Sequence, residues 1–244
     1  MMKELIELIE TYDPGYAKKL HGATEEEIAR LQNLVGRELP APYKEFLRYM
    51  GRSMGDFQIA DANFSIDVVT AIYGANDWVP PERYLFIAEH EQDPYLDYYL
   101  DLDELVDGDY KVLRFSNDGG FVEDPWSTIA LMKGFFFANA FRVKRMENFP
   151  HETLISPSLS RLSVRPAAST DMMAVVEERA LKLGFKKLPF SLPLRPMYER
   201  KDAAILGTRA PVRGGICFEL AAESERELKH LVSVLCSNTP LIEG

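Results

Sequence analysis

The densest group of potential metal ligands in this sequence is the run EHEQD, from Glu89 to Asp93. Carboxylate and imidazole groups bind zinc and other divalent metals, and a site built here would use Glu89, His90 and Asp93. No second histidine follows at the i, i+4 spacing that would place two ligands on one helix face. We therefore expect a solvated loop between two strands. A metal-binding protein or enzyme that uses the Glu89/His90 loop is kept as an alternative function.

A second acidic group could hold a pair of catalytic carboxylates. In an extended strand, Asp97 and Asp101 share one face but lie about 13 Å apart at ~3.3 Å per residue, which is too far for a catalytic dyad. The tyrosines between the carboxylates favour an interaction surface instead, because interfaces combine aromatic residues with a polar rim. We therefore predict a protein-binding face made by Tyr95, Asp97, Tyr99, Asp101, Asp103, Glu104, Asp107 and Asp109.

The remaining motifs do not match a catalytic signature. Asn117-Asp118-Gly119-Gly120 is rich in glycine but lacks the lysine and the spacing of a phosphate-binding loop, so we expect a hairpin turn there. No G-x-S-x-G run is present, and Cys217 and Cys236 lack metal-ligand spacing. Both cysteines are expected to be buried thiols. The sequence thus predicts a protein that is not an enzyme and that uses no cofactor and no metal.

The charge of the chain is concentrated in its first part. Residues 1–150 contain 15 lysines and arginines against 27 aspartates and glutamates, whereas residues 151–244 contain 13 against 11. An acidic surface repels nucleic acid and attracts basic proteins. The basic side chains of the second part, at near-neutral balance, favour surface or interdomain pairing over a nucleic-acid site. We expect a basic protein as partner and no nucleic acid.

Composition indicates a globular protein with one large or two modest domains. The chain has 244 residues, 46% of them hydrophobic and 11% aromatic, which is enough for a substantial core. No apolar run approaches the ~20 residues of a membrane span. The first ten residues, MMKELIELIE, are acidic and amphipathic, unlike a signal peptide. We expect a cytoplasmic location, a reducing environment and no membrane association.

Residues 24–51 predict two helices joined by a tight elbow. Thr24 and Glu27 have the spacing of a capping box, and Gly36 suits a left-handed C-terminal cap. Leu39-Pro40 ends the first helix, and Pro42 fits the first turn of the second. Each helix has an apolar stripe, so a sheet or other helices must cover the pair.

Several strands are expected after this helix pair. Short alternations at 57–59 and 64–68 indicate strands, and 84–88 reads as a buried strand. Residues 95–103 alternate between apolar and polar, which is typical of a half-buried antiparallel strand. Asp107-Gly108-Asp109 is expected to form a turn. Further strands are expected at 111–115 and 126–131, followed by a helix at 133–147.

The run Leu39-Pro40, a two-residue gap, Tyr43, and then Phe46-Leu47 resembles the SMI1/KNR4 (SUKH) superfamily. That family usually continues into an Asn-Gly-Gly-like turn, where this chain has Met50-Gly51-Arg52-Ser53. Thr128-Ile129-Ala130 before an aromatic-rich helix resembles the family's ending, so the resemblance covers about residues 22–147. It implies an α+β fold with a mixed or antiparallel sheet flanked by helices.

The resemblance also implies a function in binding. SUKH proteins look like non-enzymatic binding modules, and many bacterial members act as immunity proteins that neutralise a cognate toxin, often a nuclease. Fungal relatives act as regulatory interaction proteins. A basic toxin would complement the acidic first part of this chain. The leading hypothesis is therefore a bacterial immunity protein, and the alternative is a regulatory scaffold.

Residues 151–244 lie outside the resemblance and are expected to form a smaller second domain of unknown role. Prolines and serines between Asn148 and Arg165 mark the boundary, which gives domains 1–150 and 151–244. The order strand, helix, strand, strand, helix and a short last strand is compatible with a ferredoxin-like α+β sandwich. The expected elements are 162–165, 171–183, 203–207, 215–220, 224–236 and 239–242.

Overall fold

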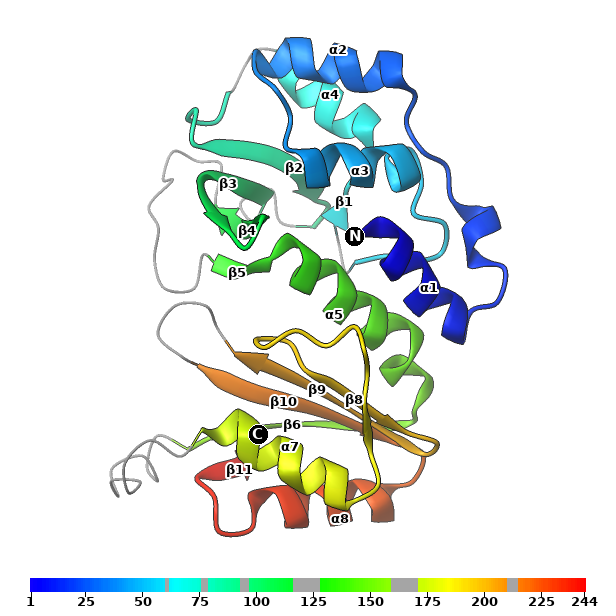
Figure 1. The fold of residues 1–244 in the computed structure, drawn as a ribbon, viewed down its shortest axis with the longest axis vertical. Helices are drawn as coiled ribbons and strands as arrows, with labels where there is room; N and C mark the ends of the chain where they lie inside the picture. The colour runs from blue at the N-terminus through cyan, green and yellow to red at the C-terminus, as the bar shows by residue number, and fades with distance from the viewer. Residues whose placement is uncertain (60–61, 76–78, 93–96, 116–127, 159–170, 210–214) are drawn as a thin grey trace. The chain divides into compact units, whose positions relative to one another are not determined.

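The computed structural model describes the chain except residues 60–61, 76–78, 93–96, 116–127, 159–170 and 210–214. Contacts divide it into two compact units, Met1–Ala140 and Phe141–Gly244. Each unit combines helices with an antiparallel sheet, which confirms the α+β class (Figure 1). The division falls inside a helix, earlier than the predicted boundary at residue 150. That the two units are separate domains stays a prediction.

Helices form the start of the first unit. They are α1 (Met2–Tyr12), the short 3-10 helix η1 (Tyr16–Lys19), α2 (Glu25–Val35) and α3 (Ala41–Met50). The predicted capping box of α2 is complete. Thr24 Oγ1 accepts the Glu27 N–H at 3.2 Å, and the Glu27 carboxylate accepts the Thr24 N–H at 2.8 Å. Gly36, at φ 76°, closes the helix as predicted.

The first sheet has five antiparallel strands in the order β1-β2-β3-β4-β5. Their bounds are Ala62–Asn63, Tyr84–His90, Asp97–Val106, Asp109–Phe115 and Thr128–Leu131. Helix α5 (Met132–Lys144) follows directly after β5. An aromatic cluster connects these elements. The rings of Phe136 in α5 and Phe46 in α3 are stacked with their centroids 4.9 Å apart, and the ring centroids of Phe135 and of Tyr98 in β3 are 5.6 Å apart.

Helix α4 (Ile66–Ala75) begins where a strand was predicted at 64–68, so that prediction is wrong. Ser65 Oγ accepts the Asp67 N–H at 3.2 Å, which satisfies a free donor at the helix start. The buried residues Ile66, Val69 and Tyr73 then repeat at helical spacing, and α4 packs against α2 (Figure 1). A five-residue window was too short to distinguish this period from strand alternation.

The second unit contains a six-stranded antiparallel sheet in the order β11-β6-β10-β9-β8-β7. Strand β10 lies between β6 and β9, which are joined through a helix, and this is the split βαβ arrangement of a ferredoxin-like sandwich. The hairpin β7–β8 is added at one edge. The bounds, in chain order, are η2 (Met146–Asn148), β6 (His151–Pro157), α7 (Met172–Lys182), β7 (Lys186–Lys187), β8 (Met197–Arg200), β9 (Ala203–Arg209), β10 (Ile216–Ala222), α8 (Glu225–Cys236) and β11 (Leu241–Glu243).

The core of the second unit lies between its sheet and the helices α7 and α8. Val176 and Leu231 from the helices pack with Phe218 from the sheet, and all three are fully buried. The strand predicted at 162–165 lies outside the described residues, and the first strand is β6. Both cysteines are only partly buried, so the prediction of buried thiols is wrong.

The second predicted capping box, at the start of α8, forms only in part. Ser224 Oγ accepts the Glu227 N–H at 3.2 Å. The Glu227 carboxylate instead pairs with Arg200, at 2.5 Å. Across the described residues, no helix is long and apolar enough to cross a membrane.

Candidate protein-binding site

Strands β3 and β4 form a hairpin that extends beyond β2. Pairing with β2 ends where Tyr84 faces Asp101, whereas β3 continues to Val106. Asp107 and Gly108 then turn the chain with φ angles of 52° and 78°, the two positive values that a type I′ turn requires. We call residues 102–109 the hairpin tip. The turn predicted at Asp107-Gly108-Asp109 is confirmed, whereas the one predicted at 117–120 lies outside the described residues.

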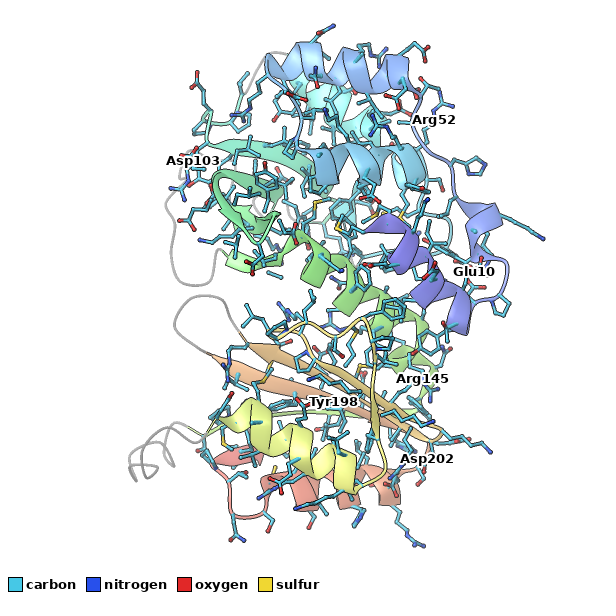
Figure 2. All side chains as sticks on the ribbon, viewed as in Figure 1. Glu10, Arg52, Asp103, Arg145, Tyr198 and Asp202 are labelled. Atoms are coloured by element: carbon cyan, nitrogen blue, oxygen red, sulfur yellow. The ribbon has the colours of Figure 1, made fainter. Side chains whose placement is uncertain are left out.

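A bulge breaks the side-chain alternation of β3 at the hairpin tip. Asp101 faces Lys111 of β4, but the next paired residue of β3 is Leu105, which faces Tyr110. Extra residues on one strand disrupt the ladder and redirect side chains. As a result, all residues from 103 to 108 are exposed. Asp103 lies on the outer side of the hairpin in Figure 2.

The hairpin tip combines exposed carboxylates with two exposed apolar residues. Leu105 is 59% exposed and Val106 is 38% exposed, and the predicted site residues Asp103, Glu104 and Asp107 flank them. Glu104 forms an ion pair with Lys111. The sequence prediction missed the Leu-Val pair, because it assigned no role to these two residues between the predicted strand and the predicted turn. The Asp-Gly turn directly after it was the available signal, because it places both residues near the end of a hairpin.

Two of the predicted surface carboxylates are buried, so the prediction of an exposed strand face is wrong for them. Asp97 is 4% exposed and accepts the His90 N–H at 3.1 Å. Asp101 is 1% exposed, and its two oxygens accept hydrogen bonds from Arg83 at 3.0 and 2.7 Å. Both faces of β3 are covered from Asp97 to Asp101, whereas the prediction assumed that one face stays open to solvent.

The electrostatics of Asp101 follow from this pairing. Burial alone would raise the pKa of its carboxyl group. Hydrogen bonds from Arg83 and from the Asp103 N–H outweigh that effect, so the pKa of Asp101 lies below its ordinary value. Asp101 is therefore held as an anion and stabilises the base of the hairpin.

Tyr99 is also buried, contrary to its predicted place on an exposed face. Its ring lies 5.7 Å from that of Phe86 and 5.9 Å from that of Phe115. Burial raises the pKa of its hydroxyl group. Tyr95, the other predicted tyrosine, lies outside the described residues.

Asp109 has a structural role at the start of α5. Its carboxylate accepts the Lys133 N–H at 2.7 Å and the Tyr110 N–H at 2.9 Å. Lys133 is in the first turn of α5, so Asp109 caps that helix from a neighbouring strand. Burial raises the pKa of Asp109, and these hydrogen bonds only partly offset that rise.

The Glu89/His90 segment is part of a strand, so the predicted loop is wrong there. Strand β2 ends at His90, and β1 pairs with it through Asn63 facing Glu89 and Ala62 facing His90. The third proposed ligand, Asp93, lies outside the described residues. Within the described chain, no three His, Cys, Asp or Glu side chains are grouped so that they could hold a metal ion.

Residues 22–132 match the model of the SMI1/KNR4 family (SUKH-1). The predicted resemblance is thereby confirmed for the helix pair α2–α3 and for the whole first sheet. The SMI1/KNR4 match covers just under half of the chain and none of the second unit. The family is generally a non-enzymatic fold that includes immunity proteins, and its members typically bind proteins. No curated protein is significantly similar to the chain.

Within the SMI1/KNR4 segment, the predicted site residues separate into two groups. Asp97, Tyr99, Asp101 and Asp109 are held by contacts inside the protein, so they support the hairpin. Asp103, Glu104 and Asp107 remain accessible around Leu105 and Val106. This arrangement can bind another protein through apolar contact and charge.

Proposed function

We propose that this chain is a non-enzymatic binding protein that docks onto a basic protein through its hairpin tip. The observation that carries the proposal is the exposed pair Leu105 and Val106, surrounded by the carboxylates of Asp103, Glu104 and Asp107. Interfaces draw most of their affinity from a dry centre inside a polar rim. An exposed apolar pair on a projecting hairpin supplies such a centre.

In its most concrete form, the proposal is a bacterial immunity protein that acts in the cytoplasm and neutralises a toxin by occluding it. The SMI1/KNR4 match supports this form, because the family includes immunity proteins. The acidic balance of residues 1–150 supports a basic partner such as a nuclease toxin and disfavours nucleic acid itself. A regulatory scaffold would use the same surface to bind a host protein.

The test begins with capture of the partner from the native organism and its identification by mass spectrometry. A toxin with a basic domain supports immunity, and a signalling protein supports the scaffold. The identified partner is then titrated against Asp103→Lys/Asp107→Asn. Asparagine is chosen at 107 because it tolerates the positive φ of the turn. We expect this variant to lose affinity by on the order of 100-fold.

The control variant is Glu7→Lys/Glu26→Gln, which changes the net charge by the same amount. Glu7 and Glu26 are exposed on α1 and α2, outside the hairpin tip. This control variant should keep nearly all of the wild-type affinity for the partner. Equal affinity of the wild type and the hairpin variant would contradict the proposed docking surface.

A further inference from the structure

A cavity of about 420 Å³ lies at the other end of the first sheet from the hairpin tip. Strand β2 runs from Tyr84, which faces the base of the hairpin, to His90, and the cavity is lined by the next residue, Glu91. The rest of its wall comes from the segment after α3 and from β1. Cavities of this size hold small ligands or single side chains.

The accessible wall of the cavity is mostly polar. Four apolar side chains line it from behind, namely Met50, Phe57, Ile59 and Phe64, but each is buried and at most 4% exposed. Met54 adds a partly exposed thioether at the wall. A surface of this kind suits the aliphatic stem of a long side chain, since methionine adapts its shape to its neighbour.

The guanidinium group that lines the cavity is already neutralised. Arg52 Nε lies 3.0 Å from Glu27 Oε1, and Arg52 Nη2 lies 2.5 Å from the same oxygen. This pair connects the cavity wall to the start of α2, and Figure 2 labels Arg52 near that helix. An anionic ligand would have to compete with a carboxylate that is already in place.

The polar side chains of the wall are also engaged within the protein. Ser53 Oγ accepts the Gly55 N–H at 3.1 Å, and Asn63 Oδ1 accepts the Ser65 N–H at 3.0 Å. Glu91 differs from them, because its carboxylate has no hydrogen bond or ion pair with any described residue. The cavity therefore presents the partly exposed thioether of Met54 and the unpaired carboxylate of Glu91.

We propose that this cavity binds the side chain of an arginine or lysine presented by the partner protein. The aliphatic stem lies along Met54, and the cationic group pairs with Glu91. A wholly apolar occupant would cover the Glu91 carboxylate without giving it a partner, which is unfavourable. Arginine is preferred, because its guanidinium group can donate two parallel hydrogen bonds to one carboxylate.

This inference rests on the proposed function for the basic partner, but the cavity is a second contact, separate from the hairpin tip. Two anchors at opposite ends of one sheet would fix the orientation of the partner. The cavity can be tested alone, without the partner.

The experiment uses the full chain with ¹³C-methyl-labelled methionine. The probes are Nα-acetyl-arginine amide, Nα-acetyl-lysine amide, the uncharged Nα-acetyl-citrulline amide and Nα-acetyl-norleucine amide. We expect saturable shifts of the Met50 and Met54 methyl signals with the two cationic probes. Citrulline, which keeps the shape of arginine and lacks its charge, should bind at least about tenfold more weakly. Free arginine should bind no better than the capped probe, because the proposed occupant is a residue within a chain.

Glu91→Gln is the decisive variant, because it keeps the shape of an exposed side chain and removes its charge. It should weaken the arginine probe about tenfold, whereas the control Glu7→Gln should leave its affinity unchanged. The inference is overturned by the absence of saturable shifts, by equal binding of citrulline, by preferred binding of norleucine or free arginine, or by an unaffected Glu91→Gln variant.

The hairpin variant Asp103→Lys/Asp107→Asn separates the two proposals. It should bind the arginine probe like the wild type while losing the partner. If the probe binds and the partner binds the hairpin variant as tightly as the wild type, the proposed docking surface is wrong and the cavity proposal stands. If the partner needs the hairpin but the probe never binds, the cavity is wrong and the proposed function stands.

Discussion

Asp101 shows how a residue that resembles a binding group can instead be part of the protein's internal support. Its carboxylate is almost completely buried and is held by Arg83 and by the Asp103 N–H. Removing one member of such a pair leaves the other without its partner. A charge reversal here would therefore disturb the hairpin itself, and would not report on binding.

We predict that Asp101→Asn lowers the free energy of unfolding by about 1–3 kcal/mol at pH 7. Burial alone would raise the pKa of Asp101, but its hydrogen bonds bring that pKa below the ordinary value of 3.8. The stabilisation that the ionised Asp101 carboxylate contributes to folding is therefore complete above about pH 4, and it is lost as the pH falls through the pKa of Asp101 in the folded protein. Urea unfolding at pH 7 and pH 3 measures both effects, and the variant should approach the wild type at the lower pH.

The matched control is Asp103→Asn, because Asp103 is exposed and its carboxylate lies 3.9 Å from Arg83 Nε. Its effect should stay within about 0.5 kcal/mol at both pH values. If Asp101→Asn were as mild as this control, the Arg83 pair would not stabilise the hairpin.

The residues of β3 also show what sequence reasoning could and could not determine. Alternation correctly indicated a strand and which side chains share a face, and Tyr98 and Tyr99 do lie on opposite faces. It could not determine whether solvent reaches the second face, because that depends on segments distant in sequence, such as Phe86 and Phe115 around Tyr99. The three exposed site residues were thus predicted together with others that are buried.

At the scale of elements, the signals that were predicted correctly are local ones. The α2 capping box, the Leu-Pro elbow and the Asp-Gly turn each depend on a few adjacent residues with fixed hydrogen-bonding or backbone preferences. The β3 bulge and the start of α4 were not predicted. The bulge depends on the register against β4, and α4 required a longer window than five residues.

The hairpin turn gives a prediction at this scale. Gly108 has φ 78°, and a Cβ atom built on it would meet no atom within 4 Å. Gly108→Ala should therefore lower the free energy of unfolding by about 1 kcal/mol through backbone strain alone. Thermal unfolding measures this effect, and partner binding should weaken with it if the turn positions Leu105.

Gly74 is the matched control, because it lies in helix α4 and a Cβ atom added there would likewise meet no atom within 4 Å. Alanine is preferred to glycine inside a helix, so Gly74→Ala should raise stability by about 0.5–1 kcal/mol. Opposite signs for the two substitutions are expected. The same sign for both would argue that the turn is not of type I′.

At the scale of the whole molecule, the order strand, helix, strand, strand, helix, strand indicated the ferredoxin-like arrangement of the second unit, but its first strand β6 and the added hairpin β7–β8 were not predicted. The first unit is recognised through two short motifs, the run from Leu39 to Leu47 and the ending at Thr128-Ile129-Ala130, and its sheet is built from strands whose pairing the sequence does not reveal. The negative charge of residues 1–150, in contrast, is a property of the sequence alone. This charge predicts that the protein attracts a basic partner electrostatically before any contact forms, which affects the association rate.

We predict that association with the basic partner slows by about tenfold or more as salt rises from ~0.03 to ~0.3 M, since the Debye length falls across this range. Stopped-flow measurements at several salt concentrations give the association rate. A rate that is independent of salt would contradict electrostatic steering.

Leu105→Ala separates steering from docking in the same measurement. Loss of an uncharged side chain should leave the association rate and its salt dependence unchanged, because neither depends on apolar contact. The dissociation rate should instead rise by about tenfold or more, as expected for a residue at the centre of an interface. Leu34→Ala, at an exposed position on α2, is the control and should change neither rate. If Leu105→Ala behaved like this control, the centre of the interface would lie elsewhere, even if the acidic charge still steered the partner.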